Sequence, residues 1–229
     1  MILGIIGAGA MGSGIAQVAA QAQAQVFVYD QQPEALSRAR ANLERILARQ
    51  VAKKRMTAEE TTAVLGRITW TEHLAELAGC EWVIEAIVED LGIKQAVFRE
   101  LEALTGPDTL LATNTSSLSV AAIASACERP ERVMGIHFFN PAPLMKLVEL
   151  VPAVQTAPAR VTQAREVIAG WGKTPVVAKD TPGFIVNRVA RPFYGEALKM
   201  YEEGLASPAT VDWAMTKLGG FRMGPFALM

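Results

Sequence analysis

Short apolar runs alternate with longer amphipathic stretches along most of the chain. Apolar runs of about five residues are typical of strands buried on both faces, whereas apolar positions three and four residues apart indicate helices packed through one side. This pattern predicts strands at residues 2–6, 26–29, 68–70, 82–86, 110–113, 133–137, 147–151 and 175–178. It predicts helices at residues 12–21, 33–54, 92–104, 120–126 and 161–171, and a capping box of Thr57 and Glu60 begins a further short helix.

Strands that alternate with helices predict an α/β fold, a doubly wound and mostly parallel sheet of the Rossmann type with right-handed β-α-β crossovers. The pattern changes at D-T-P-G, after Lys179, because only helical patterns follow it, over residues 184–200 and 208–218. We therefore expect two domains, at residues 1–180 and 181–229. The second would be the beginning of an all-helical domain. It is too short to bury a core alone, and its last residues, G-P-F-A-L-M, show no closing element.

Composition and charge exclude several classes of protein. Hydrophobic residues make up 51% and charged residues 20% of the chain, so it can bury a sizeable core and is not intrinsically disordered. With 22 basic and 23 acidic residues the net charge is −1, which argues against nucleic acid or an anionic membrane as a partner. The two cysteines, Cys80 and Cys127, support neither a disulfide framework nor a metal site, so a reducing, cytoplasmic location fits best.

Residues 1–24 contain almost no charge, which raises the question of a targeting segment. A signal peptide needs a basic region before its apolar stretch, and the first basic residue here is Arg38. Five glycines and two glutamines in the same stretch argue against a membrane-spanning helix. We therefore expect neither a signal peptide nor a membrane span.

The sequence G-A-G-A-M-G has the form of a dinucleotide-binding turn, because it directly follows a predicted strand and opens a predicted helix. Gly7 would permit the tight turn, Gly9 would let the backbone approach a pyrophosphate, and Gly12 would allow close packing of helix on strand. N–H groups and the positive dipole end at the helix start would bind the phosphates. The candidate cofactor-binding residues here are Gly7, Ala8, Gly9, Ala10, Met11 and Gly12. The alternative is a glycine-rich turn that binds nothing.

Asp30 ends the predicted strand in V-F-V-Y-D and follows Gly12 at close to the spacing of about 20 residues expected for a ribose-binding acid. Its carboxylate would accept hydrogen bonds from the adenosine ribose hydroxyls and would repel a 2′-phosphate. The expected cofactor is therefore NAD, with NADP disfavoured. The alternative interpretation of Asp30 is an ordinary acid in the turn after a strand.

The chain has two histidines in very different surroundings. His73 lies in the polar stretch T-E-H-L-A-E-L and is expected to be a solvated surface residue. His137 ends an apolar strand in G-I-H-F-F-N-P, and ligands of open α/β sheets bind beyond the carboxyl ends of the strands. An imidazole titrates near neutral pH and can take the hydroxyl proton of an alcohol that is oxidised. His137 is therefore the candidate base, although a lone histidine beside an apolar strand is more often structural.

Three further polar residues stand in otherwise apolar or loop-like surroundings. Ser116 follows a strand end in T-N-T-S-S, Glu149 interrupts the apolar run K-L-V-E-L-V, and Asn187 lies in the first turns of the first helical segment of the second domain. A charge inside a strand is costly unless it is paired, and a catalytic imidazolium would pair with Glu149. Each residue also has a structural alternative: Ser116 as a helix cap, Glu149 at an exposed sheet edge, and Asn187 on a helix surface.

Taken together, these segments resemble the NAD-dependent L-3-hydroxyacyl-CoA dehydrogenase family, which includes 3-hydroxybutyryl-CoA and 3-hydroxyadipyl-CoA dehydrogenases. The resemblance runs from residue 2 to residue 229. It is carried by G-A-G-A-M-G-S-G-I-A, V-I-E-A-I-V-E-D, A-T-N-T-S-S-L-S, H-F-F-N-P-A-P-L-M-K-L-V-E, D-T-P-G-F-I-V-N-R and M-G-P-F. The H-F-F-N-P and P-G-F-I-V-N-R blocks are highly specific.

The resemblance implies a role for each catalytic candidate. His137 would remove the proton of the 3-hydroxyl group, and Glu149 would fix the ring and stabilise the imidazolium. Ser116 and Asn187 would donate hydrogen bonds to the substrate and orient it toward the nicotinamide.

The resemblance also implies binding contacts. The further cofactor contacts are Glu89, Lys94, Ser116 and Asn140. Lys53 and Lys54 match basic positions that meet the CoA phosphates in the family, and their alternative is a solvated helix end. Ile46 stands where some relatives place a CoA-contacting serine, which puts that contact in doubt.

The implied activity is oxidation of an (S)-3-hydroxyacyl-CoA to a 3-oxoacyl-CoA with hydride transfer to NAD, in fatty-acid β-oxidation or phenylacetate-type catabolism. One alternative is a dehydrogenase of a related small hydroxy acid, although such relatives commonly use a lysine base. Another is a non-catalytic, crystallin-like protein that binds NAD. Relatives continue past M-G-P-F for several helices that complete the second domain and form much of the dimer interface. We therefore expect a truncated chain or a fragment whose full-length form is a homodimer.

Overall fold

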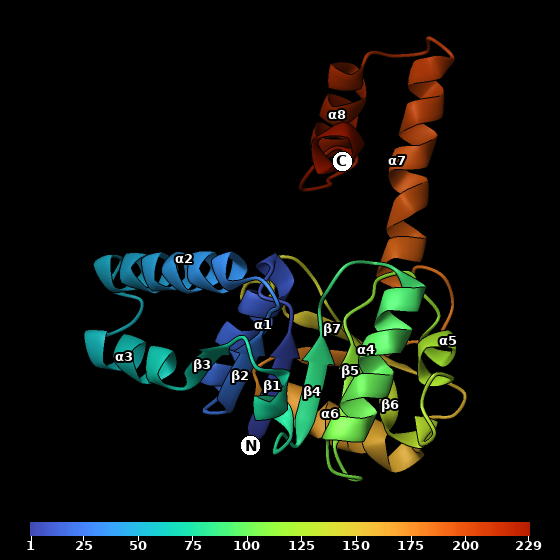
Figure 1. Ribbon diagram of the computed structural model, residues 1–229. Coiled ribbons are helices and arrows are strands. Elements are labelled where there is room, and N and C mark those ends of the chain that lie inside the picture. The colour runs from blue at the N-terminus through green and yellow to red at the C-terminus, as the bar shows by residue number, and fades with distance from the viewer. The chain divides into compact units, whose positions relative to one another are not determined.

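The computed structural model describes residues 1–229, and an eight-stranded sheet with helices packed on it forms its largest part (Figure 1). The strands are β1 (Ile2–Ile6), β2 (Gln25–Tyr29), β3 (Ile68–Thr71), β4 (Trp82–Glu85), β5 (Leu110–Thr113), β6 (Val133–Phe138), β7 (Leu147–Pro152) and β8 (Thr174–Val177). The helices and 3₁₀ turns are α1 (Ala10–Gln21), α2 (Pro33–Ala52), α3 (Ala58–Gly66), η1 (Leu74–Leu77), α4 (Leu91–Leu104), α5 (Val120–Ala124), η2 (Pro130–Arg132), α6 (Pro158–Gly170), α7 (Val186–Glu202), α8 (Pro208–Lys217) and α9 (Pro225–Leu228).

The strand order is β3-β2-β1-β4-β5-β6-β7-β8, which confirms the doubly wound, mostly parallel sheet. From β1 the chain proceeds outward through β2 and β3, and it then returns to place β4 on the other side of β1. Because the winding direction changes between β1 and β4, the connections that leave these two strands diverge and open a crevice at their carboxyl ends. Ligand-binding residues are expected at this place in the fold.

Strand β7 breaks the parallel pattern, because it runs antiparallel to β6 while β8 runs parallel to β7. The sequence pattern predicted the strand but not its direction. The register of the antiparallel pair places His137 directly opposite Glu149. Side chains of directly opposed residues point to the same face of a sheet, so these two residues are neighbours although twelve positions separate them in the chain.

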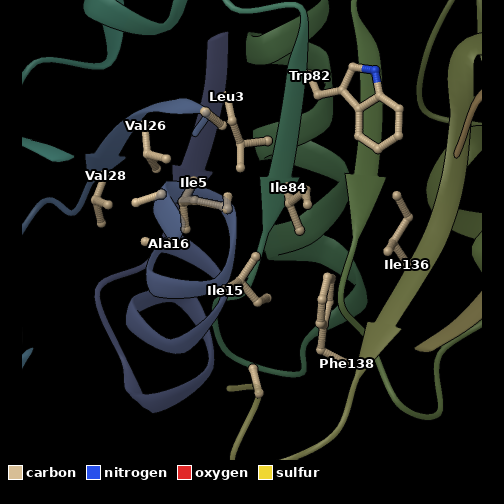
Figure 2. Close-up of a cluster of buried hydrophobic side chains, with 14 of the residues drawn as sticks. Leu3, Ile5, Ile15, Ala16, Val26, Val28, Trp82, Ile84, Ile136 and Phe138 are labelled. Carbon is tan, nitrogen blue, oxygen red and sulfur yellow. The ribbon is translucent and has the colours of Figure 1, made fainter. Parts of the chain in front are cut away.

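One face of the sheet is covered by α1, α2 and α6. Alternate residues of the strands, such as Leu3, Val26 and Ile84, point toward this face and are fully buried there. Figure 2 shows these side chains meeting Ile15 and Ala16 of α1. Because strands with both faces covered are apolar at every position, the runs recognised in the sequence lacked the alternation of a half-exposed sheet.

The opposite face is covered by η1, α4 and α5. A Cβ atom added to Gly4 of β1 would meet Leu77 of η1, and one added to Gly135 of β6 would meet Val120 of α5. The side chains of His137 and Glu149 share this face, since they lie two residues along the strands from the Gly135–Val151 pair.

Residue contacts divide the chain into two compact units, Met1–Thr181 and Pro182–Met229. The end of the first unit is bound to the start of α5. The Asp180 carboxylate accepts hydrogen bonds there from the Ser119 hydroxyl and from the backbone N–H groups of Val120 and Ala121. The functions expected of the two domains stay predictions.

The second unit contains α7, α8 and α9, and α9 corrects one expectation. The last residues form a short helix, whereas the sequence pattern showed no closing element. Pro225 occupies the first turn, where its missing N–H group costs nothing, and the Asp212 carboxylate accepts hydrogen bonds from the N–H groups of Phe226 and Ala227.

Most predicted helices are present with ends shifted by a few residues. The Thr57–Glu60 capping box is confirmed at the start of α3, which lies beside α2 as a helical hairpin (Figure 1). Helix α1 begins at Ala10, two residues earlier than predicted, because Gly9 takes the extended conformation of an N-cap. None of the helices combines the length and the apolar character needed to cross a bilayer.

The glycine turn yields a stability prediction. We expect Gly12→Ala to lower the free energy of unfolding by at least about 2 kcal/mol, because the new methyl group would overlap the carbonyl oxygen of Gly7. A thermal melt should show a midpoint lower by roughly 4–8 °C. Gly9→Ala is the matched control, since no heavy atom lies within 4 Å of the added Cβ. Equal losses in the two variants would contradict this account of the turn.

Candidate active site

The turn after β1 is built around two crowded glycines and an open one. Gly7 has a φ of +99°, and a Cβ there would lie 2.6 Å from the carbonyl oxygen of Ala86. Gly12 packs against the carbonyl of Gly7 and so brings α1 close to β1. Gly9, in contrast, faces open space. Two of the glycines are therefore required by the protein itself, and the third leaves room for a ligand at the N-terminus of α1.

Asp30 lies beside this turn at the end of β2. Its Oδ2 atom accepts a hydrogen bond of 2.8 Å from the N–H of Ala8, and its Oδ1 atom accepts one of 3.0 Å from the N–H of Gln32. The carboxylate is half-buried. Because each carboxylate oxygen has two lone pairs, both oxygens can accept a further hydrogen bond from a ribose hydroxyl.

A cavity of about 320 Å³ opens at the carboxyl ends of β4, β5 and β6. It collects six of the predicted site residues from segments far apart in the sequence. They are Met11, Glu89, Lys94, Ser116, His137 and Asn140. The glycine turn and this cavity both adjoin the crevice between β1 and β4, where the topology predicts a ligand.

His137 and Glu149 form a buried hydrogen-bonded pair. The His137 Nδ1 and Glu149 Oε2 atoms are 2.7 Å apart, and the residues are 5% and 0% exposed. The Phe139 ring, with its centroid 4.5 Å from that of the imidazole, packs beside it. The structural alternative for Glu149 is wrong, because β7 lies between β6 and β8 and is not a sheet edge. The pair therefore satisfies the Glu149 carboxylate and orients the ring.

A second buried pair, which the sequence reasoning missed, lies next to the first. Glu85, at the end of β4, is 0% exposed, and its Oε1 atom is 2.5 Å from the Nζ atom of Lys94, which is 1% exposed. The Thr113 hydroxyl and the N–H of Ile87 also donate hydrogen bonds to the Glu85 carboxylate, each with a length of 2.8 Å. The argument applied to Glu149, that a charge inside an apolar strand needs a partner, would have identified Glu85 as well.

Glu89 organises the loop that contains Ser116. Its Oε1 atom accepts hydrogen bonds from the Thr115 hydroxyl at 2.5 Å and from the N–H of Ser116 at 3.0 Å. Ser117 donates to the same oxygen from its N–H and its hydroxyl. Partial burial opposes ionisation, but these hydrogen bonds and the Lys94 ammonium outweigh it, so the pKa of Glu89 lies below its ordinary value. The alternative for Ser116 is wrong, since Ser119 caps α5.

Asn114 is a second residue that sequence reasoning missed. It lines the cavity, and its Oδ1 atom accepts a hydrogen bond of 2.8 Å from the N–H of Phe138. This bond connects the end of β5 to the end of β6, beside His137. Asn114 stands in the same T-N-T-S-S segment as Ser116, the only residue of that segment that the sequence pattern singled out.

The remaining predicted residues lie elsewhere. Lys53 and Lys54 follow the last turn of α2 and are exposed. Asn187 belongs to α7 in the second unit. The roles that the resemblance implies for these three residues stay predictions. His73 is exposed, as expected for a surface residue.

The residues present fit a bound dinucleotide. Open space at Gly9 and the N-terminus of α1 suit a pyrophosphate, the Asp30 carboxylate suits the adenosine ribose, and the cavity beyond Met11 suits the nicotinamide half. All of these features lie within the first unit.

Comparison with known proteins identifies the same family for both units. Residues 2–181 match the model of the 3-hydroxyacyl-CoA dehydrogenase NAD binding domain, and residues 183–229 match that of the 3-hydroxyacyl-CoA dehydrogenase C-terminal domain. The chain is 48% identical over 224 residues to the 3-hydroxyadipyl-CoA dehydrogenase of Escherichia coli (strain K12). It is 43% identical over 229 residues to the probable 3-hydroxybutyryl-CoA dehydrogenase of Deinococcus radiodurans.

A solved structure agrees with these matches. The crystal structure of (S)-3-hydroxybutyryl-CoA dehydrogenase from Ralstonia eutropha is similar to the present fold with a TM-score of 0.96 and 35% sequence identity, covering 99% of this chain and 80% of that one.

The two sequence relatives differ in how much of their own length the chain matches. The alignment with the Escherichia coli protein covers 98% of this chain and 47% of that protein, and the alignment with the Deinococcus radiodurans protein covers 100% of this chain and 82% of that protein. The chain therefore spans about half the length of the first relative and about four fifths of the second.

The buried Glu85–Lys94 pair predicts a large cost for removing one charge. We expect Glu85→Gln to lower the free energy of unfolding by about 3 kcal/mol, because the Lys94 ammonium is left buried without its nearest counter-charge. Chemical denaturation measures the change. The control is Glu44→Gln, which breaks an exposed ion pair with Arg40 and should cost less than about 0.5 kcal/mol. Similar losses in both variants would contradict the prediction.

The position of Asp30 predicts a preference for NAD. Titration of the protein with each cofactor should give tighter binding of NAD than of NADP, because the Asp30 charge repels a 2′-phosphate. Asp30→Asn removes the charge and keeps one acceptor oxygen for the Ala8 N–H, although it gives up the bond from the Gln32 N–H, so it should narrow the preference for NAD over NADP. Equal or better catalytic efficiency of the unchanged protein with NADP would exclude this role.

Proposed function

The chain belongs to the 3-hydroxyacyl-CoA dehydrogenase family, and from this premise we propose that it oxidises an (S)-3-hydroxyacyl-CoA to the 3-oxoacyl-CoA while NAD⁺ is reduced to NADH. The observation that supports this most directly is the His137–Glu149 pair, which lies at the cavity where the implied cofactor residues gather. NAD supplies the hydride acceptor when it is bound. The protein supplies the base, its charged partner and a rim of hydrogen-bonding groups.

His137 takes the proton that leaves the 3-hydroxyl group. Its Nδ1 atom is engaged by Glu149, and an imidazole that keeps its hydrogen on Nδ1 presents the lone pair on Nε2. Nε2 is therefore the nitrogen that accepts the proton. The charge that develops on the ring is stabilised by the Glu149 carboxylate at 2.7 Å, in surroundings from which water is largely excluded.

Ser116 orients the substrate at the rim of the cavity. Its hydroxyl belongs to a loop whose N–H groups are bound to Glu89, so the loop does not have to reorganise when the substrate arrives. Glu89 and Lys94 form an ion pair of 3.4 Å, line the same cavity and would contact the cofactor. Asn140, which follows β6 and lines the cavity, would also contact it.

The proposal extends to the biological setting. The names of the relatives, 3-hydroxyadipyl-CoA and 3-hydroxybutyryl-CoA dehydrogenase, support a short or carboxylated acyl chain. We propose that the reaction belongs to fatty-acid β-oxidation or phenylacetate-type catabolism in the cytoplasm, and that the protein is a homodimer. Light scattering of the protein in solution tests the homodimer, and kcat/KM measured across acyl-CoAs of different chain length tests the substrate.

An absorbance assay of NADH consumption tests the proposed reaction. We expect turnover with acetoacetyl-CoA and with longer or carboxylated 3-oxoacyl-CoAs, compared at equal protein concentration. Reduction of small oxo acids by NADH in place of the CoA thioesters would favour the alternative dehydrogenase. NAD binding without turnover of any 3-oxoacyl-CoA would favour a non-catalytic protein and refute the proposal.

Replacement of the proposed base gives a sharper test. His137→Gln should lower kcat by about 10²–10⁴-fold while NAD affinity changes little, since general-base catalysis contributes about that much. The exposed His73 provides a matched control, and His73→Gln should leave kcat unchanged. Comparable losses at both histidines would show that the base is misassigned.

The pair predicts non-additive losses. Glu149→Gln should lower kcat, because the carboxylate is proposed to act on the reaction through the His137 ring, 2.7 Å away. The double variant of Glu149→Gln and His137→Gln should therefore be no slower than His137→Gln alone. Steady-state kinetics of the three variants measures the coupling. Strictly additive losses would mean that the two residues act separately.

A further inference from the structure

The loop between β6 and β7, residues 139–146, connects the strand of His137 to the strand of Glu149. It folds back on itself, because the carbonyl of Pro141 accepts hydrogen bonds from the N–H groups of Leu144 and Met145, at 3.0 and 3.1 Å. Its inner side is buried and its outer side is not. Ala142 is 1% exposed, whereas Leu144 is 75% exposed.

This loop is a wall shared by two cavities. Asn140 lines the cavity that contains His137 and also lines a second cavity of about 350 Å³. The second cavity is bounded by α1 and α2 on one side and by Pro141, Pro143 and Leu144 of the loop on the other. The position of the loop therefore sets the shape of both cavities at once.

Lys173, from the turn between α6 and β8, binds the inner side of this loop. Its Nζ atom donates hydrogen bonds of 2.6 Å to the carbonyl oxygen of Ala142 and 2.9 Å to that of Met145, and a longer one of 3.4 Å to that of Pro143. An ammonium group has three donors, and here they meet three carbonyl groups of one loop. Desolvation lowers the pKa of Lys173 from its ordinary value.

The turn between α6 and β8 that contains Lys173 is itself held in place. Trp171 packs on the core, with its ring centroid 6.3 Å from that of Phe138. The N–H of Thr174 donates a hydrogen bond of 2.8 Å to the carbonyl of Lys146 at the end of the loop. Because the residues on both sides of Lys173 are held in place, its three hydrogen bonds restrict the position of the loop.

We propose that Lys173 is a positioning residue for the reaction, because it fixes the 139–146 loop and thereby the place of Asn140 at one cavity and of Leu144 at the other. This inference rests on the proposed function. The residue touches the loop carbonyls and acts through them on cofactor and substrate. The strand pairing of β6 with β7 does not depend on Lys173, so its loss should displace the loop and leave the His137–Glu149 register intact.

The test compares Lys173→Met with Lys146→Met. Both variants remove one positive charge, and Lys146 is an exposed residue of the same loop. We expect kcat/KM per folded protein to fall at least about tenfold in Lys173→Met, since small misplacements of positioning groups cost that much or more. We expect it to stay within about twofold in Lys146→Met. Lys173→Arg, which keeps a cationic donor, should recover part of the loss.

A second measurement separates this inference from the proposed function. Hydrogen–deuterium exchange at the Leu144 and Met145 amides should become faster in Lys173→Met and stay unchanged in Lys146→Met, and the NAD dissociation constant should rise at least about threefold. Neither readout requires turnover. If the unchanged protein shows no dehydrogenase activity, the proposed function fails. Amide exchange and the NAD dissociation constant then still test whether Lys173 positions the loop. Unchanged exchange, or faster exchange with unchanged kcat/KM in an active protein, overturns the proposal.

Discussion

Helices cover both faces of the sheet, so a charged side chain on an inner strand has little water around it and needs a partner within the protein. Glu85 on β4 and Glu149 on β7 are both fully buried, and both are paired, with Lys94 and His137. The Glu85 and His137 ends of these pairs lie near the carboxyl ends of their strands, beside the crevice that the topology opens. The requirement to satisfy buried charge therefore also holds the polar groups of the site in fixed positions.

The glycines of the turn after β1 are required for two different reasons, close packing within the protein and space for a ligand. Gly7 and Gly12 have no room for a side chain because the backbone itself approaches them, whereas Gly9 has room that the protein does not fill. We therefore expect substitution of Gly7 or Gly12 to act on folding and substitution of Gly9 to act on ligand binding. The same sequence motif thus contains two separable constraints.

Two loops at the cavity are each organised by one charged side chain of opposite sign. Glu89 gathers N–H and hydroxyl donors of the Ser116 loop, and Lys173 gathers carbonyl acceptors of the 139–146 loop. Backbone outside the sheet has donors and acceptors that no strand pairing satisfies, so a single ionic group can fix several of them together. In both cases the fixed loop presents to the cavity a residue for which we propose a binding role.

Patterns along the chain are sufficient to predict most of the elements, the α/β class and the candidate site residues. The apolar runs and the capping box reflect local periodicity and local hydrogen bonds, which a linear pattern contains. The glycine turn, Asp30 and the importance of Glu149 followed from their spacing and from the cost of burying a charge. The short helix α9 was missed, because the Asp212 carboxylate that accepts hydrogen bonds from its Phe226 and Ala227 N–H groups lies far from it in the chain.

Tertiary structure alone decided which residues meet. The antiparallel direction of β7 and its register place Glu149 opposite His137, and neither can be read from an apolar run that is the same in both directions. The partnership of Glu85 with Lys94 and that of Lys173 with the 139–146 loop depend on how α4 and α6 pack on the sheet. Such contacts arise from long-range packing, and long-range packing leaves no period in the sequence.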